Sequence, residues 1–176
     1  MTFVYLDTET TSLDPDTGEI WELAYAVDDG EIVADFLPHD LMHAQPAALR
    51  IGRYLDRVPD VIRGSRSAST PFETEAMKAM GRATIVGANP AFDTAFLRAR
   101  WGHAPWHHRI LDIEAYAMPA FGWDEPRGLK DVAEACRSRT SLRGRDIPEP
   151  DHTAAGDVAT VRACHLALRD YYRRTR

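Results

Sequence analysis

The sequence of 176 residues has few cysteines and no long hydrophobic run. Cys136 and Cys164 are the only cysteines, and their spacing is not that of a metal-binding motif. We therefore expect two buried, reduced thiols in a cytoplasmic protein. No stretch approaches the roughly 18 apolar residues that a membrane span requires, so we expect no membrane association. A basic N-terminal region is also missing, which argues against a cleaved signal peptide.

Lysine is scarce as well. All but Lys78 and Lys130 of the 21 basic residues are arginines, and the formal net charge is −6. A chain of this charge does not attract nucleic acid by bulk electrostatics. Bound divalent cations would, however, offset acids that gather at one site, and arginine binds phosphate with a planar fork. GC-rich codon usage is the simpler explanation of the arginine excess, so net charge decides little about nucleic acid as a partner.

Hydrophobic patterning predicts five strands interspersed with helices. The strands are expected at Phe3–Thr8, Glu19–Val27, Glu31–Leu37, Ala83–Gly87 and Arg109–Ile113. The helices are expected at Pro46–Arg57, from Ser69-Thr70-Pro71 to Met80, at Ala91–Trp101, in a short stretch that Pro119 ends, at Leu129–Cys136 and at Thr153–Tyr172. Asp28-Asp29-Gly30 predicts a hairpin, which argues against a wholly parallel sheet. We therefore expect one α/β domain over residues 1–176, with helices around a mixed sheet.

An acidic pair stands at the end of the first predicted strand. Side chains two apart in a strand point to the same face, so Asp7 and Glu9 project together. Two anions this close repel each other, and one would hold a proton unless a cation neutralised them. Carboxylate oxygens are ligands that suit Mg²⁺ or Mn²⁺. Asp-x-Glu also occurs by chance on solvated strand edges, so this pair alone does not establish a metal site.

A second acidic position follows the fourth predicted strand, in Gly87-Ala88-Asn89-Pro90-Ala91-Phe92-Asp93. Asn89 is expected as a helix N-cap with Pro90 in the first helical position. Asp93 then lies in the first turn of the helix. The helix dipole favours a carboxylate there whether or not it has a function.

A third position is His152-Thr153-Ala154-Ala155-Gly156-Asp157, where a proline-flanked loop enters the last helix. The small residues around Asp157 would let this helix approach a strand or a ligand closely. A lone loop histidine is usually only solvated, and an Asp early in a helix is common. This motif is therefore ambiguous when taken by itself.

Together, and in this order, the three motifs resemble those of the DEDDh family of 3′→5′ exonucleases, which includes proofreading exonuclease subunits, ribonuclease T and oligoribonuclease. Asp7-Thr8-Glu9-Thr10-Thr11-Ser12-Leu13 matches the first motif, except that Ser12 stands where glycine is usual. Asn89, Phe92 and Asp93 match the second motif, and His152, Ala154 and Asp157 match the third. The resemblance covers nearly the whole chain. It implies an RNase H-like fold with a central five-stranded mixed sheet whose second strand is antiparallel.

The resemblance also implies a mechanism. Asp7, Glu9 and Asp157 would hold one Mg²⁺ or Mn²⁺ ion, Asp7 would bridge to a second ion, and Asp93 would assist through water. Two divalent ions stabilise the attacking and leaving oxygens of a phosphodiester. His152 would be the general base, because imidazole titrates near neutral pH. The implied activity is release of nucleoside monophosphates from the 3′ end of single-stranded nucleic acid, with DNA favoured over RNA.

Five further residues are candidates for contacts with the substrate. Leu13 would wedge against the terminal base, Phe92 would stack on or beside it, and the backbone near Thr10 and Thr11 would contact the 3′-hydroxyl, as the resemblance implies. Asn89 belongs to this set through the second motif. Core packing explains Phe92 at least as well, and a leucine such as Leu13 is more often buried than functional. Stacking and phosphate contacts carry no sequence code, so cleavage should depend little on sequence.

Several alternatives stay open. An RNase H-type endonuclease shares the carboxylates and the two metal ions, although His152 and Asn89 favour an exonuclease. An exoribonuclease or oligoribonuclease, a hydrolase of small phosphoesters, and a non-catalytic nucleic-acid-binding subunit of a replication or repair complex are further candidates. The chain is compatible with a homodimer or with association to a polymerase. The Pro46–Arg57 segment matches no general feature of the family and is a candidate for defining the substrate.

Overall fold

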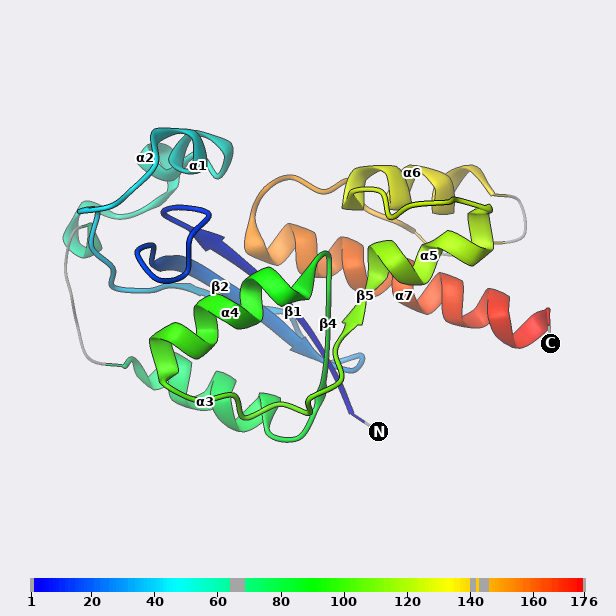
Figure 1. Cartoon of the computed structure of the whole chain (residues 1–176), viewed down its shortest axis with the longest axis horizontal. Helices are drawn as coiled ribbons and strands as arrows, with labels where there is room; N and C mark the ends of the chain where they lie inside the picture. Colours follow the sequence, from blue (N-terminus) through cyan, green and yellow to red (C-terminus); the bar gives the residue numbers. More distant parts are fainter. Residues whose placement is uncertain (1, 64–68, 140–141, 143–145, 176) are drawn as a thin grey trace.

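A five-stranded mixed sheet with helices on both faces forms the framework of the computed structural model, which describes residues 2–63, 69–139, 142 and 146–175 (Figure 1). Its strands are β1 (Phe3–Thr10), β2 (Ile20–Val27), β3 (Val33–Phe36), β4 (Thr84–Gly87) and β5 (Leu111–Asp112), in the order β3-β2-β1-β4-β5. β2 runs antiparallel to β1 and β3, whereas β4 pairs parallel with β1 and β5. The predicted mixed sheet with an antiparallel second strand is confirmed.

The helices follow the predicted alternation in the second half of the chain. They are α1 (Pro46–Ile51), α2 (Tyr54–Arg57), the 3-10 helix η1 (Asp60–Ile62), α3 (Pro71–Met80), α4 (Pro90–Trp101), α5 (Ile113–Phe121), α6 (Leu129–Ser138) and α7 (Ala154–Arg174). Across the described residues, no helix has the length and apolar character needed to cross a membrane.

The strand β1 separates two hydrophobic cores. Tyr5 points to the core that α5, α6 and α7 cover, whereas Val4 and Leu6 point to the core that α3 and α4 cover. This alternation follows from the pleat, which sends successive side chains to opposite faces. β1 lies in the middle of the sheet and is buried on both sides, so its position is fixed by packing. Its polar end is consequently held at a defined place.

Two predictions about helices are wrong. The Pro46–Arg57 segment is not one helix, because it turns at Gly52 and at Arg53, whose φ of 51° is left-handed. The turn lets Tyr54 pack with Trp21 and Val58 in a small third core. Pro119 does not end α5, which continues to Phe121 and stops at Gly122 with a φ of 68°. α5 thus runs through Pro119 without the hydrogen bond that its missing N–H would have made, and buries Ala117 and Ala120 against the core.

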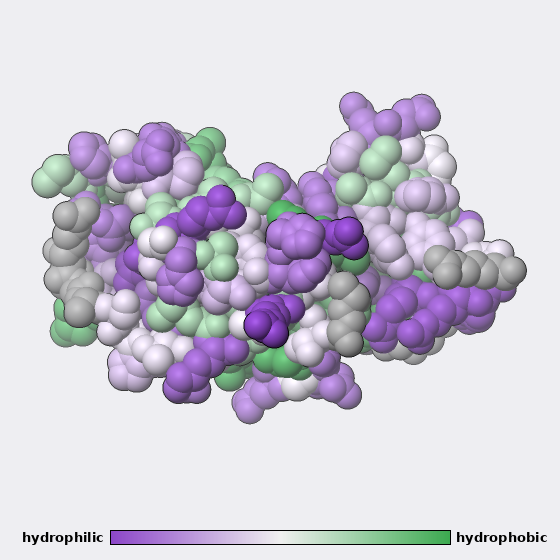
Figure 2. All heavy atoms as spheres, turned by 60° about the horizontal axis from the view of Figure 1, so that its bottom comes forward, coloured by the Kyte–Doolittle hydropathy of each residue, from purple (hydrophilic) through white to green (hydrophobic). Residues whose placement is uncertain are grey.

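Four segments that are distant in sequence meet at the carboxyl end of β1. These are the end of β1 itself, the start of α4, the start of α7 and the α1–α2 segment. Gln45, just before α1, donates its backbone N–H to the Thr11 carbonyl at 2.7 Å. Figure 2 shows the molecular surface indented between the part formed by α1 and α2 and the part formed by α6.

Candidate active site

The first acidic pair, Asp7 and Glu9, lies near the carboxyl end of β1, on the face that α7 covers. Asp7 pairs across the sheet with Ala24, and Glu9 pairs with Glu22, a second acid on β2. Like charges directly opposite each other in a sheet are destabilising. Asp7 and Glu9 are both half-buried, so neither charge is fully relieved by water. The sheet therefore concentrates negative charge at this point.

Asp93 reaches the same end of β1 from the opposite face. It lies in the first turn of α4 and is 3% exposed. Its Oδ1 accepts hydrogen bonds from the backbone N–H of Thr8 at 2.9 Å and from the Thr8 hydroxyl at 2.6 Å. Thr8 stands between the two acids of the first motif, so these bonds lock Asp93 to the strand that carries them. Thr8 was not predicted as a site residue, although it stands between Asp7 and Glu9 in the first motif.

Asp157 lies in the first turn of α7 and is half-buried. Thr153 is the N-cap of this helix, and its side chain accepts the N–H of Gly156 at 2.9 Å. One carboxylate oxygen of Asp157 accepts the backbone N–H of Asp151 at 3.1 Å. His152 is exposed and has a left-handed φ of 57°. A non-glycine residue in this conformation is strained and persists only where its surroundings hold it.

The electrostatics show that these acids are neighbours. Burial raises the pKa of Asp7 well above its usual range, and the carboxylates of Asp93, Asp157 and Glu9 raise it further. Burial and the nearby Glu22 raise the pKa of Glu9 to about 8. Burial also raises the pKa of Asp93 to about 7, although the hydrogen bonds from Thr8 oppose the change. The carboxylates of Asp93 and Asp157 thus make ionisation of Asp7 and Glu9 more costly, so acids of β1, α4 and α7 lie near one another.

This set of carboxylates fits a hard divalent cation. Ionised carboxylates supply the oxygen ligands that Mg²⁺ and Mn²⁺ prefer, and a cation would relieve the repulsion that raises their pKa values. Within the described part of the chain, no three Asp, Glu, His or Cys side chains are arranged so that they could hold a metal ion as they stand. The Oδ1 atoms of Asp93 and Asp157 are occupied by hydrogen bonds from Thr8 and Asp151. Binding therefore requires side chains of the set to turn.

Two charged residues at the site were not anticipated. Glu22 is 5% exposed, and Arg57 pairs with it through a short Nη2–Oε1 contact. The cost of the Glu9–Glu22 opposition is thereby reduced. Gly52 also lies against the site, because a Cβ there would lie 2.8 Å from the Glu9 carboxylate. A lone acid inside the apolar run Ile20-Trp21-Glu22-Leu23 was the sequence signal for Glu22, whereas nothing local distinguished Arg57.

The β1–β2 loop uses most of its polar groups internally. The Thr10 hydroxyl donates to the Ser12 carbonyl at 2.7 Å, and the Thr10 carbonyl accepts the Trp21 indole N–H at 3.1 Å. The N–H and carbonyl of Thr11 bond to Glu19 and Gln45. Leu13, in contrast, is 73% exposed. The loop is therefore rigid and presents an apolar side chain at its tip.

Ser12 does not have the left-handed backbone conformation that only glycine adopts without strain. It is fully buried, and its hydroxyl both donates to and accepts from the Asp14 backbone. The space that it fills is left by Gly18, where a Cβ would come within 2.2 Å of the Ser12 oxygen. Serine is thus accommodated by a compensating glycine, and no acid of the site is displaced.

Asn89 and Phe92 flank the start of α4. Asn89 is the residue before the helix, as expected, but its φ is 50° and its side chain makes no capping hydrogen bond. The predicted side-chain N-cap is therefore wrong. The Asn89 side chain is exposed. Phe92 is half-buried and packs against Phe96 with ring centroids 4.8 Å apart, so core packing accounts for part of its surface.

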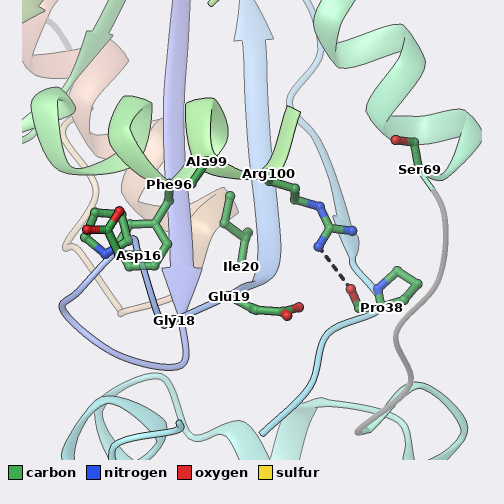
Figure 3. Close-up of a pocket in the computed structure, with 10 residues that line it drawn as sticks. Asp16, Gly18, Glu19, Ile20, Pro38, Ser69, Phe96, Ala99 and Arg100 are labelled. Carbon is green, nitrogen blue, oxygen red and sulfur yellow. Dashed lines mark hydrogen bonds between the residues drawn. The ribbon is translucent and has the colours of Figure 1, made fainter. Parts of the chain in front are cut away.

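A cavity of about 540 Å³ lies elsewhere, between the β1–β2 loop and α4 (Figure 3). Ile20, Phe96 and Arg100 are among the residues that line it. None of the predicted catalytic residues does. The Arg100 guanidinium in this cavity already bonds the Pro38 carbonyl at 3.1 Å and pairs with Glu73. Among the described residues that line it, the cavity therefore offers no free cation for a phosphate, and it is separate from the carboxylate site.

Comparison with solved structures decides the fold. An Escherichia coli exonuclease I structure with a dA16 oligonucleotide matches with a TM-score of 0.69 and 17% identity over 98% of this chain. A second exonuclease I structure gives a TM-score of 0.67 at 20% identity. NrnC from Brucella melitensis gives 0.60 at 15% identity over 98% of this chain. The chain has the fold of these exonucleases. The resemblance that the three motifs indicated is thus confirmed at the level of the fold.

The exonuclease fold is shared over different fractions of these proteins. The chain spans 42% and 44% of the two exonuclease I chains and 74% of NrnC. No protein-family model matches the sequence, and no curated protein sequence matches it. The similarity to these proteins is therefore one of tertiary structure.

Proposed function

We propose that this protein is a metal-dependent 3′→5′ exonuclease that removes nucleoside monophosphates from the 3′ end of single-stranded nucleic acid, with DNA favoured over RNA. The observation that carries the proposal is that acids from three distant segments lie near the end of β1: Thr8, between Asp7 and Glu9, hydrogen-bonds Asp93, and the carboxylates of Asp93 and Asp157 raise the pKa of Asp7 and Glu9. A fold adopts such an unfavourable set of charges where a cation is to be bound. The shared fold with exonuclease I and NrnC supports the same activity.

Asp7, Glu9 and Asp157 would hold one Mg²⁺ or Mn²⁺ ion, with Asp7 shared with a second ion and Asp93 acting through water. When bound, such ions supply charge neutralisation for the attacking and departing oxygens of the phosphodiester. Thr8 would keep Asp93 aligned through its two hydrogen bonds. The rigid framework of β1 would thus fix the backbone of Asp7 and Glu9, from which their side chains turn to take up the metal.

His152 would accept the proton of the attacking water. It is exposed, it precedes α7 by two residues, and Asp157 of the same helix start lies close enough to interact with it electrostatically. Leu13, exposed at the tip of the β1–β2 loop, would pack against the terminal base. Phe92 would add an aromatic contact with its exposed part, and Asn89 with its free amide would lie beside it. Thr10 and Thr11 would act by shaping this loop, because their hydroxyls are bonded within it.

The proposal is tested with an end-labelled single strand in the presence of Mn²⁺ or EDTA. We expect stepwise release of mononucleotides from the 3′ end that stops in EDTA. Internal cuts would identify an RNase H-type endonuclease instead. Binding of the strand without metal-dependent turnover would identify a non-catalytic subunit. Each of these two results would overturn the proposal.

One observation favours a second candidate, an exonuclease for very short oligonucleotides. The chain covers a larger share of NrnC than of exonuclease I, and one NrnC structure is bound to pGG. Matched DNA and RNA substrates, each as a dinucleotide and as a long strand, separate the candidates. A preference for the dinucleotide would support the second, and a preference for long DNA would support the first. Dimerisation and association with a polymerase are further parts of the proposal. Sedimentation of the pure protein would test the first, and sedimentation of a mixture with a polymerase would test the second.

A further inference from the structure

The last residue of α2, Arg57, joins segments that surround the proposed general base. Its Nη2 pairs with Glu22 on β2. Its Nη1 donates to the carbonyl of Gly52 at 3.1 Å and to the carbonyl of His152 at 3.3 Å. The guanidinium lies 5.2 Å from the Trp21 ring centroid and is 14% exposed. One side chain therefore connects β2, the α1–α2 turn and the loop before α7.

Glu22 holds the same loop from its other side. Its second oxygen, Oε2, accepts the backbone N–H of Ala154, the first residue of α7, at 3.1 Å across 132 residues of sequence. Arg57 thus binds the carbonyl of residue 152, and its ion-pair partner binds the N–H of residue 154. The peptide on each side of Thr153 is anchored to one buried ion pair. Figure 1 shows α2 and the start of α7 near the same end of β1.

We propose that Arg57, together with Glu22, is a positioning residue that sets the backbone of His152 for catalysis. This inference rests on the proposed function. His152 has a left-handed backbone, which a histidine keeps only when neighbouring contacts determine it. A general base must lie within hydrogen-bond reach of the proton that it takes, and a misplacement of about 1 Å costs on the order of 100-fold in rate. The bonds within the loop fix the N–H groups of Asp151 and Thr153, and the ion pair adds an anchor for the carbonyl of His152 from outside the loop.

The chemistry of the anchor requires arginine. The planar guanidinium has five N–H donors, so it can serve two carbonyls and a carboxylate at once while its face lies over Trp21. A lysine keeps the charge but has no fork and no flat face. An Arg57→Lys variant therefore keeps the positive charge beside Glu22 and loses the geometry. This variant therefore distinguishes a role of Arg57 in positioning the His152 backbone from a role in compensating the charge of Glu22.

A double-mutant cycle tests the inference. We expect Arg57→Lys and Arg57→Gln to lower kcat by about 10- to 100-fold with little change in KM. In a His152→Ala background the same substitutions should change kcat by no more than about 2-fold, because the group that they position is gone. If the losses of kcat from the two substitutions multiply in the double variants, the inference is overturned, because Arg57 then acts independently of His152.

Arg162→Gln is the matched control, because Arg162 also donates from its guanidinium to a loop carbonyl, that of Gly30, at 2.6 Å. It should leave kcat unchanged. An equal loss in this variant would show that any such anchor matters only for stability, and would overturn the inference. Manganese affinity, measured by calorimetry, should be the same in wild type and in Arg57→Lys.

Hydrogen exchange keeps the inference testable apart from activity. The amides of Thr153 and Ala154 should exchange faster in Arg57→Gln than in wild type, and at the wild-type rate in Arg162→Gln. If the wild-type protein lacks exonuclease activity, the proposed function fails while the anchor is still detected by exchange. If the enzyme is active and Arg57→Gln retains wild-type kcat and exchange, the anchor fails and the proposed function stands.

Discussion

Two regions of the molecule contain buried carboxyl groups and treat them differently: the packing of α3 against α4 around Glu73, and the carboxyl end of β1. On the α3 and α4 face, Glu73 is fully buried. Its carboxylate accepts two bonds from Arg100 and one each from Trp101 and the Thr70 backbone. Burial alone would raise its pKa, but these partners outweigh burial and hold it below its usual range. Glu73 is therefore an ionised structural acid.

At the carboxyl end of β1, Asp7 and Glu9 have pKa values far above their usual range, because burial is reinforced by neighbouring acids. Arg57 offsets only part of this effect on Glu9. The comparison separates two kinds of buried acid. An acid whose hydrogen bonds are complete stabilises the fold, whereas an acid that lacks compensation is available for a ligand. The following predictions test this distinction, from the largest expected effect to the smallest.

Removing one acid from the uncompensated set should abolish activity without harming the fold. We expect Asp7→Asn to lose metal-dependent turnover and to bind Mn²⁺ more weakly, because a shared ligand is gone. In EDTA its free energy of unfolding should equal or exceed that of wild type, since one repelling charge is removed. Calorimetry and urea denaturation measure the two effects. Asp29→Asn, in the exposed β2–β3 turn, is the control, and a clear loss of stability in Asp7→Asn would contradict the distinction.

Removing the proposed base should affect only chemistry. His152→Ala is expected to lower turnover by about 10²- to 10⁴-fold, as is typical for loss of a general base, with unchanged Mn²⁺ affinity and stability. Single-turnover rates on an end-labelled strand measure this. His103→Ala, at an exposed histidine after α4, should behave as wild type. Wild-type rates in His152→Ala would remove this residue from the mechanism.

Removing the compensated acid should have the opposite effect. Glu73→Gln breaks a buried ion pair and leaves Arg100 without its carboxylate, which should cost about 3 kcal/mol of unfolding free energy. Manganese affinity should not change. Glu75→Gln on the same helix is the control, because its pair with Lys78 is exposed and should contribute little. A larger loss of stability for Glu75→Gln than for Glu73→Gln would reverse the assignment.

The pH dependence of stability should report the uncompensated acids. Glu9 and Asp93 have folded pKa values of about 8 and about 7, above their ordinary values of 4.5 and 3.8, so the folded chain binds their protons more tightly than the unfolded chain does. Their contribution is complete below the unfolded values and is lost as pH rises through the folded ones. Without metal, stability should fall by up to about 1.4 kcal/mol per pH unit and carboxyl over this window. Urea denaturation in EDTA measures the slope, and saturating Mn²⁺ should reduce it.

The elements of the fold were largely accessible from local patterns. The apolar run of Phe3–Thr8, the turn at Asp28-Asp29-Gly30 and the helix start at Ser69-Thr70-Pro71 each have a local physical cause, and each was placed correctly. The edge strands β3 and β5 are shorter than expected, because each has only one neighbouring strand to pair with. The break at Arg53 was missed, since the packing of Tyr54 against Trp21 that rewards it is not visible in sequence.

The site divides in the same way. Three motifs with fixed spacing identified Asp7, Glu9, Asp93, His152 and Asp157 as a candidate set, because a carboxylate pair on a strand and an acid in a first helical turn have local signatures. Their convergence is an outcome of strand order and helix packing. The contacts of Thr8 with Asp93 and of Glu22 with Ala154 span 85 and 132 residues, so no local pattern encodes them.

The sequence by itself determined which residue types are present, which segments form strands and helices, and which positions carry acids and the histidine. Only the tertiary structure decided that an ion pair and hydrogen bonds compensate the charge of Glu73 while the charges of Asp7 and Glu9 lack such compensation, and that Arg57 lies against the carbonyl of His152. The physical reason is that the free energy of a buried charge depends on the partners around it. Those partners are brought together by folding from distant parts of the chain.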